Sequence, residues 1–257
     1  MHQSWDIVVL GLGAMGSAAL YQLSQRGGRV LGIDQFAPPH SLGSSHGDTR
    51  ITRQAIGEGR HFVPLALRSR EIWHSLERKT GKSLYVANGC LIFGREGECR
   101  GDHGTSEFLE VTRRAATEFG IAHELLDHTQ LRKRFPQFQY LGDEVAYLEP
   151  GGGYLRPEEC IAANLSCARD DGAAIYLNQR DTALEPSPSG EGVILRYGDS
   201  TLRAARVIIA AGAWAGSFLP AELARHLQVF RQVLHWFPLT GDPAPYLPCL
   251  LYTSPSP

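Results

Sequence analysis

Three glycines near the start of the sequence have the spacing of a phosphate-binding turn. In Gly11-x-Gly13-x-x-Gly16 the first glycine permits a tight turn, and the second lets backbone approach a pyrophosphate. The third lets a helix pack closely on a strand. Asp34 follows 18 residues after Gly16, where a carboxylate can accept hydrogen bonds from ribose hydroxyls. The pattern predicts dinucleotide binding, but alone it does not separate FAD from NAD, because both use the same cradle.

A second segment, residues 44–53, concentrates polar and cationic side chains just after this acid. Arg50 and Arg53 could hold a carboxylate by forked hydrogen bonds, or stabilise negative charge on a reduced flavin ring. If Asp48 caps a helix, the two arginines share one helix face. A solvated basic face is the alternative, and it is the commoner fate of arginine pairs. The loop residue His46 is open to the same two interpretations.

The elements that must position these residues follow from the hydrophobic pattern. Residues 6–10 are β-branched and apolar, as in a buried parallel strand; a helix over 17–25 and a strand over 29–33 follow. A further buried strand at 206–211, ending in small residues, is predicted to return to this sheet after a long excursion. FAD folds of the glutathione-reductase type make such a return, whereas NAD dehydrogenases usually do not. An unrelated core strand is the alternative interpretation.

The rest of the pattern predicts helices and short strands in alternation, so the fold class is α/β. Residues 35–48 form an irregular loop, and Asn88-Gly89 is the turn of a hairpin over 84–94. The other expected elements are helices over 64–81, 106–119, 124–135 and 157–171, a turn over 186–192, and strands over 174–177, 193–197 and 230–239.

Composition excludes several classes of function. Lys and Arg number 25 against 27 acidic residues, so a net charge of −2 attracts neither nucleic acid nor a membrane surface. Five cysteines without a C-x-x-C pair argue against a disulfide framework and against a metal site, and favour a cytoplasmic location. No run of about 18 apolar residues predicts a membrane span. The expected partner is a small molecule.

Longer motifs show a family resemblance. They are PPH at 38–40, GSSHGDTRITRQAIGEGRHFVPLALRS at 43–69, LIFG at 91–94, EPGGGYLRPE at 149–158, AGAW at 211–214 and FRQVLHWF at 230–237. The sequence resembles the monomeric sarcosine oxidase and N-methyltryptophan oxidase family up to about residue 240. The resemblance implies a Rossmann-like FAD-binding domain of the glutathione-reductase type, made of 1–84 and 150–224. An inserted mixed-sheet substrate domain would comprise 85–149 and 225–248.

The resemblance also implies roles for individual residues. His46, Thr49 and Arg50 would lie beside the flavin ring, and Arg53 would pair with the substrate carboxylate. Family members oxidise secondary amino acids, N-methyl or cyclic, by hydride transfer to flavin N5, and O2 then yields H2O2. A monomer with these two small-molecule partners is expected. Residues implied to hold FAD are Gly11, Gly13, Ala14, Met15, Gly16, Asp34, Gln35, Ser44, Ser45, Arg50, Gly212 and Trp214, the last two on the returning strand.

The sequence departs from the family in two respects. Ile56 stands where the family usually has an aromatic residue three positions after the carboxylate arginine, which puts sarcosine itself in doubt as the substrate. The family's flavin-linking cysteine, its oxygen-activating lysine and a second carboxylate-binding lysine lie in a C-terminal part that this sequence lacks. Its own cysteines at 90, 99, 160 and 167 are expected to be small buried hydrophobes.

A truncated chain is therefore expected, and its last nine residues, CLLYTSPSP at 249–257, match a translated transposase-type sequencing adapter. Two alternatives to an FAD-dependent amine oxidase remain at this point. One is an NAD(P)-dependent dehydrogenase. The other is a nucleotide-binding fragment without turnover, because a sheet that lacks its last segment leaves an open edge and an uncovered core.

Overall fold

The computed structural model describes residues 4–95 and 108–231, together with residues 233, 235, 238 and 240–242. The chain divides into two compact units. Unit 1 comprises the described residues of 1–48, 78–82 and 156–234, and unit 2 those of 49–77, 83–155 and 235–257. The predicted FAD-binding and substrate domains remain a prediction, and their boundaries differ from these units mainly over residues 49–77.

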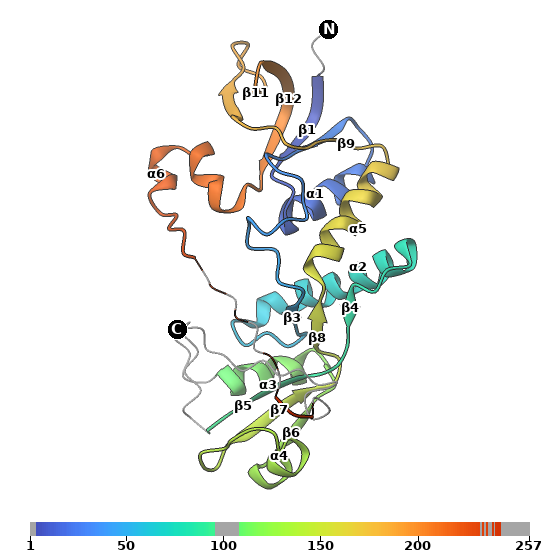
Figure 1. Cartoon of the computed structure of the whole chain (residues 1–257), viewed down its shortest axis with the longest axis vertical. Coiled ribbons are helices and arrows are strands. Elements are labelled where there is room, and N and C mark those ends of the chain that lie inside the picture. Colours follow the sequence, from blue (N-terminus) through green and yellow to red (C-terminus); the bar gives the residue numbers. More distant parts are fainter. Residues whose placement is uncertain are drawn as a thin grey trace. The chain divides into compact units, whose positions relative to one another are not determined.

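Unit 1 is built on a six-stranded sheet in the order β10-β11-β12-β1-β2-β9 (Figure 1). The central strand β1 (Ser4–Leu10) pairs in parallel with β2 (Val30–Ile33) and with β12 (Ser200–Ile209). The register sets Leu10 opposite both Ile33 and Ile209, so the three strands end at one edge of the sheet. The predicted return to the sheet is thus confirmed. The other strands are β9 (Ala174–Tyr176), parallel to β2, and the antiparallel β10 (Ala183–Pro186) and β11 (Val193–Tyr197).

Two helices of unit 1 pack against each other, α1 (Ala14–Ser24) and α5 (Pro157–Asp170). Leu20 of α1 and Ile161 of α5 are buried, as are Cys160 and Cys167, which agrees with the prediction of buried cysteines. After β12 the chain forms a 3-10 helix, η2 (Gly212–Phe218), and the short helix α6 (Ala221–Ala224).

The strand β12 corrects two expectations. It was predicted to be buried, but of its residues only Leu202 and Ala204 are buried, and Ile208 is 38% exposed. It ends at Ile209, so Gly212 and Trp214 lie in η2 and not on the strand. Gly212, where η2 begins, has a φ of 52°, a backbone conformation that favours glycine.

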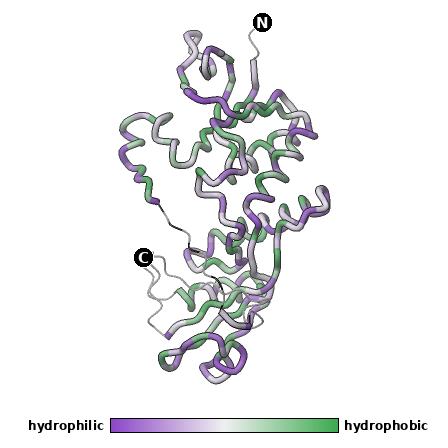
Figure 2. The backbone as a smooth tube through the Cα atoms, viewed as in Figure 1, coloured by the Kyte–Doolittle hydropathy of each residue, from purple (hydrophilic) through white to green (hydrophobic). Residues whose placement is uncertain are grey.

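Unit 2 contains two antiparallel three-stranded sheets, ordered β3-β8-β4 and β5-β7-β6. Buried residues of β5 and β7, among them Leu91 and Leu148, pack on Leu131 of α4. Figure 2 shows the hydrophilic character of α4, whose last turn is basic. The strands are β3 (Arg50–Thr52), β4 (Tyr85–Val86), β5 (Cys90–Gly94), β6 (Glu124–Leu126), β7 (Val145–Glu149) and β8 (Gly153–Leu155); the helices are η1 (Arg60–Phe62), α2 (Val63–Thr80), α3 (Phe108–Glu118) and α4 (His128–Arg134).

The predicted hairpin over 84–94 is wrong, because its two halves belong to different sheets. β4 pairs with β8 while β5 pairs with β7. Between them the N–H of Gly89 donates to the carbonyl of Gly152, 3.0 Å away, instead of closing a turn within the segment. A Cβ at Gly153 would lie 1.9 Å from the carbonyl oxygen of Val86, so the glycine run lets the two connections cross closely.

Two further predictions need correction. Residues 124–126 form β6, and α4 begins only after Asp127, whose side chain and Gln130 form a capping box. No strand is found among the described residues of 230–239. Cys99 and the 249–257 tail lie outside the described residues. Within the described part of the chain, no helix is both long and apolar enough to cross a membrane.

Candidate functional site

The glycine turn of unit 1 is held by close backbone contacts. Gly11 has a φ of 90°, and a Cβ there would lie 2.5 Å from the carbonyl oxygen of Ala210, which follows β12. A Cβ at Gly16 would lie 1.7 Å from the carbonyl oxygen of Gly11. The turn, the helix and the returning strand therefore touch at distances that only glycine permits.

Gly13 differs from the other two glycines because space is left beside it. A Cβ there would meet only the hydroxyl oxygen of Ser45, at 3.9 Å. Gly13 is the N-cap of α1 and supplies no side-chain cap; the first turn of α1 holds no acidic residue. The N–H of Ala14 donates to the Ser45 hydroxyl at 3.4 Å, and Met15 next to it is 79% exposed. A helix N-terminus with this open approach fits a pyrophosphate group.

Asp34, at the end of β2, is tied to the glycine turn. Its carboxylate accepts hydrogen bonds from the N–H of Leu12 at 2.6 Å and from the N–H of Phe36 at 2.8 Å. The group is 6% exposed. Each carboxylate oxygen can accept a second bond, so these contacts leave capacity for the predicted ribose hydroxyls. Gln35, the next predicted cofactor residue, stands between Asp34 and Phe36 in the sequence.

The loop with Ser44, Ser45 and His46 is anchored to the start of α5. Glu158, in the first turn of that helix, accepts from the N–H of Gly47 at 2.7 Å and from that of Asp48 at 3.4 Å. Sequence reasoning missed this residue. Its signal was the Pro-Glu pair that opens α5 within the motif at 149–158.

Trp214 reaches the same part of unit 1 from η2. Its ring meets that of Phe36 edge to face, with 5.6 Å between centroids. Trp214 is 37% exposed and so presents an indole face beside the loop that follows Asp34. Together with Gly212 at the start of η2, it lies in unit 1 with the glycine turn.

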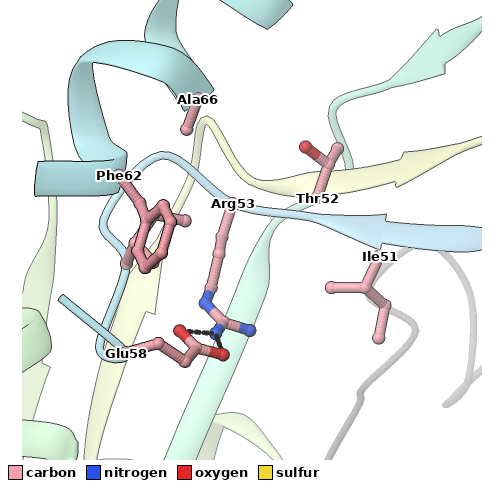
Figure 3. Close-up of a pocket in the computed structure, with 7 residues that line it drawn as sticks. Ile51, Thr52, Arg53, Glu58, Phe62 and Ala66 are labelled. Atoms are coloured by element: carbon pink, nitrogen blue, oxygen red, sulfur yellow. Dashed lines mark hydrogen bonds and ion pairs between the residues drawn. The ribbon is translucent and has the colours of Figure 1, made fainter. Parts of the chain in front are cut away.

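Unit 2 carries the predicted carboxylate arginine. Nη2 of Arg53 lies 2.6 Å from both carboxylate oxygens of Glu58, as Figure 3 shows. The guanidinium also lies over the ring of Phe108, 5.3 Å from its centroid, a cation–π contact. An open pocket of about 480 Å³ surrounds this pair, lined by Ile51, Thr52, Arg53, Ile56, Glu58, Phe62 and Ala66.

The conditional helix through Arg50 and Arg53 is wrong. Residues 50–52 form β3, which pairs with β8 through Arg50–Leu155 and Ile51–Tyr154. Figure 3 shows Ile51 and Thr52 leaving this strand in opposite directions, with Arg53 pointing to the side of Ile51. Alternation along the strand therefore places Arg50 on the side of Thr52, away from Arg53. Thr49 and Arg50 are exposed.

The predicted site residues thus fall into two groups. The glycine turn, Asp34, Gln35, Ser44, Ser45, His46, Gly212 and Trp214 belong to unit 1, and Thr49, Arg50 and Arg53 to unit 2. Sequence reasoning missed Glu58 as the partner of Arg53. It carried no local signal, since a glutamate five residues from an arginine is common in any charged loop.

Comparison with known proteins places these features in context. Residues 6–255 match the family described as "FAD dependent oxidoreductase". The chain is 38% identical to a monomeric sarcosine oxidase of Streptomyces avermitilis over 248 residues, which covers 96% of this chain and 62% of that protein. An N-methyl-L-tryptophan oxidase of Yersinia pestis is 36% identical over 237 residues, which covers 92% and 60%.

Solved structures give the same fold. NikD, described as an unusual amino acid oxidase essential for nikkomycin biosynthesis, matches with a TM-score of 0.72 and 27% identity, over 84% of this chain and 53% of that one. L-proline dehydrogenase from P. horikoshii matches with a TM-score of 0.71 and 20% identity, over 88% and 57%. The chain spans about three-fifths of the length of the curated relatives it matches.

Proposed function

The chain belongs to the FAD-dependent oxidoreductase family, and on this basis we propose that it carries the cofactor cradle and the carboxylate site of a secondary amino acid oxidase. N-methyl or cyclic amino acids are the proposed substrates. The two sites lie in different units, so each is argued from its own residues. FAD, held by the residues of unit 1, would supply the two-electron oxidation of the amine N–CH bond, with O2 as the final acceptor and H2O2 as the product.

Unit 1 supplies the cofactor site in this proposal. The amides at the start of α1 would hold the pyrophosphate, and the open space at Gly13 would let it approach the backbone. Asp34 would accept from the ribose with the capacity that its bonds to Leu12 and Phe36 leave. Ser45, already bonded to the first helical amide, would border the phosphate.

Unit 2 supplies the substrate site, and one observation carries this part: Arg53 holds a carboxylate in an open pocket. That carboxylate belongs to Glu58, and a substrate carboxylate offers the same two oxygens to the same guanidinium. The pocket walls at Ile51, Ile56 and Phe62 are apolar and suit a hydrocarbon substituent on the amine. Ile56, in place of an aromatic ring, leaves room for a group larger than the methyl of sarcosine.

A second proposal concerns the chain on its own: it binds FAD but does not turn over substrate. Apolar side chains stay exposed after β12, with Val229 at 65% and Phe230 at 68%. Single exposed apolar residues are common, but a run of them marks a surface that another part of a protein covers. The dehydrogenase alternative is not favoured, because the family match is to FAD-dependent enzymes.

The first experiment is an absorbance spectrum of two purified proteins, this chain and the product of the complete gene. A yellow full-length protein that bleaches anaerobically with an N-methyl amino acid supports the proposal. A protein that stays colourless after FAD is added overturns the cofactor assignment. Peroxide production by the chain alone would contradict the second proposal.

Arginine variants of the full-length protein test the substrate site. Arg53→Met should raise KM by about 30-fold, because the substrate carboxylate loses charge-assisted hydrogen bonds worth about 2 kcal/mol, while flavin content stays unchanged. Arg68→Met is the control: this arginine of α2 pairs with Glu71 on the surface and lines no part of the pocket. Equal effects of the two variants would refute the assignment of Arg53.

A further inference from the structure

A buried carboxylate lies directly behind the Arg53 pocket. Glu149, the last residue of β7, is fully buried in unit 2. Its two oxygens accept from the N–H of Gln54 at 2.7 Å, the N–H of Ala55 at 3.1 Å and the side-chain amide of Gln54 at 3.3 Å. A buried charge is tolerated only when it is hydrogen-bonded in this way. These donors belong to Gln54 and Ala55, the two residues that follow Arg53.

Further hydrogen bonds lie on both sides of the contact between Glu149 and Gln54. The amide oxygen of Gln54 accepts from Nη1 of Arg70 at 2.6 Å, so α2, Gln54 and β7 are joined in one chain of hydrogen bonds. On the other side, the Tyr147 hydroxyl donates to Glu149 at 3.0 Å. Burial, together with the nearby Glu149, raises the pKa of Tyr147 well above its ordinary value. Tyr147 therefore remains a donor at neutral pH.

The rest of the loop has little freedom to compensate for a change at Glu149. Ala55 is fully buried. A Cβ at Gly57 would lie 2.5 Å from both the ring of Phe108 and the hydroxyl of Thr112 in α3. The loop is thus fixed at residues 54–55 by Glu149 and at residue 57 by α3, and Glu58 returns from it to Arg53.

We infer that Glu149 is a positioning residue: it sets the carboxylate affinity of the Arg53 pocket through the backbone at residues 54–55, without touching the substrate. This inference rests on the proposed role of Arg53. Glu149 follows Arg53 by 96 residues in the sequence. Its hydrogen bonds to Gln54 and Ala55 connect it to the segment that follows Arg53.

Glu149→Gln is the test variant because it keeps the shape of the side chain. A glutamine has one acceptor oxygen, so its NH2 group would face a backbone N–H that then lacks a partner. The pocket loop should shift to relieve this. In full-length holoprotein, KM for the amino acid should rise about five- to tenfold, with kcat changed less than twofold and FAD content unchanged. A kcat loss with an unchanged KM would overturn the inference.

A binding measurement makes the test independent of turnover. Methoxyacetate, in which an oxygen replaces the amine nitrogen of sarcosine, can be titrated by calorimetry, and its Kd should rise by the same factor as KM. Glu144→Gln is the matched control. Glu144 is also buried and also accepts from two backbone amides, those of Leu141 and Gly142 at 2.7 and 3.0 Å, but in another loop of unit 2. It should lower the melting temperature and leave KM and Kd unchanged.

Further variants separate the possible failures. If Glu149→Gln does not fold, Tyr147→Phe removes one donor and retains the carboxylate, and it should raise Kd two- to threefold; an unchanged Kd there overturns the inference. Equal shifts in Glu149→Gln and Glu144→Gln also overturn it, because they indicate a general loss of structure. If Arg53→Met weakens methoxyacetate binding and Glu149→Gln does not, only the inference fails. If Arg53→Met itself has no effect, the proposed function fails and the inference with it.

Discussion

The two regions proposed to bind anions, the start of α1 in unit 1 and the Arg53 pocket in unit 2, are built on opposite plans. In unit 1 the helix α1 begins with no acidic residue in its first turn, and space remains beside Gly13. In unit 2 the guanidinium of Arg53 already holds the carboxylate of Glu58. An anion can therefore bind at α1 without displacing a chain carboxylate there. At Arg53 it must compete with one.

The difference also concerns what holds each region in shape. Backbone atoms in contact, at Gly11 and Gly16, set the turn of unit 1. The loop that follows Arg53 is set by the carboxylate of Glu149. Close backbone contacts leave no room for an added atom, while the hydrogen bonds of a carboxylate depend on its two acceptor oxygens.

The largest effect is expected at the closest contact. Gly16→Ala should destabilise the chain by about 3 kcal/mol, because its Cβ would overlap the backbone at Gly11 and backbone cannot move aside. Gly13→Ala, at a φ of −66°, should fold like the wild type and bind FAD more weakly. Urea unfolding and FAD titration measure both. Wild-type stability in Gly16→Ala would show that the contact does not hold the turn.

The next largest effect is expected at Asp34, which directly follows β2. Asp34→Ala leaves two amide donors, those of Leu12 and Phe36, without their acceptor and should cost about 2 kcal/mol. Asp6→Ala is the control, since Asp6 also accepts from a backbone N–H, that of Arg29, but is exposed. The same unfolding assay should give a clearly smaller loss for Asp6. Similar losses would mean that burial of Asp34 does not matter.

Acid should weaken unit 2 through Glu77, whose carboxylate accepts hydrogen bonds from the backbone N–H groups of Leu84 and Tyr85. Burial of Glu77 acts to raise its pKa, but hydrogen bonds from the Tyr85 N–H, from His74 and from the Leu84 N–H outweigh it, and the pKa is lowered below 4.5. This contribution to stability is therefore complete above about pH 4.5 and is lost as the pH falls through the lowered pKa.

Glu77→Gln should accordingly cost about 1.5 kcal/mol at pH 7. The difference from the wild type should shrink as the pH falls through the lowered pKa of Glu77. Guanidinium unfolding at a series of pH values measures it. A difference that stays constant with pH would exclude the charged form of Glu77 as the acceptor.

The smallest effect is expected at Glu58, whose carboxylate pairs with Arg53. Glu58→Gln should tighten methoxyacetate binding by no more than about fivefold, because a partly exposed ion pair contributes at most about 1 kcal/mol. Side-chain exposure is 21% for Arg53 and 36% for Glu58. Glu71→Gln, which breaks the exposed pair with Arg68, should leave binding unchanged. Weaker binding in Glu58→Gln would show that Glu58 supports the site and does not compete for it.

Local patterns were enough to predict the part of the fold that local patterns determine. The strand, glycine turn, helix and second strand of unit 1, with Asp34 at its end, were confirmed, as was the family. Each of these is set by residues within a few positions of one another. The hairpin at 84–94 was wrong because Asn88-Gly89 also suits a crossing between two sheets, and the choice depends on glycines at 152–153.

The site was predicted less completely, for the same reason. Arg53 was predicted from its motif, and its role stays a prediction; three carboxylates that hydrogen-bond in the two regions were not predicted: Glu58, Glu149 and Glu158. Glu149 acts on amides 94 and 95 residues away, and Glu158 on amides 110 and 111 residues away. A hydrogen bond between a carboxylate and a distant backbone N–H produces no periodic pattern in the sequence.

The parallel pairing of β1 with β12 has a consequence for how the protein is made. Leu10 finds its partner Ile209 only after almost two hundred further residues have been synthesised. At about 5–20 residues per second, that interval lasts on the order of 10–40 seconds. During this time one edge of β1 lacks its partner, while the two sheets of unit 2, whose strands lie within residues 50–155, can already form on the ribosome. The sheets of unit 2 can thus form before β12, the partner of β1, has been made.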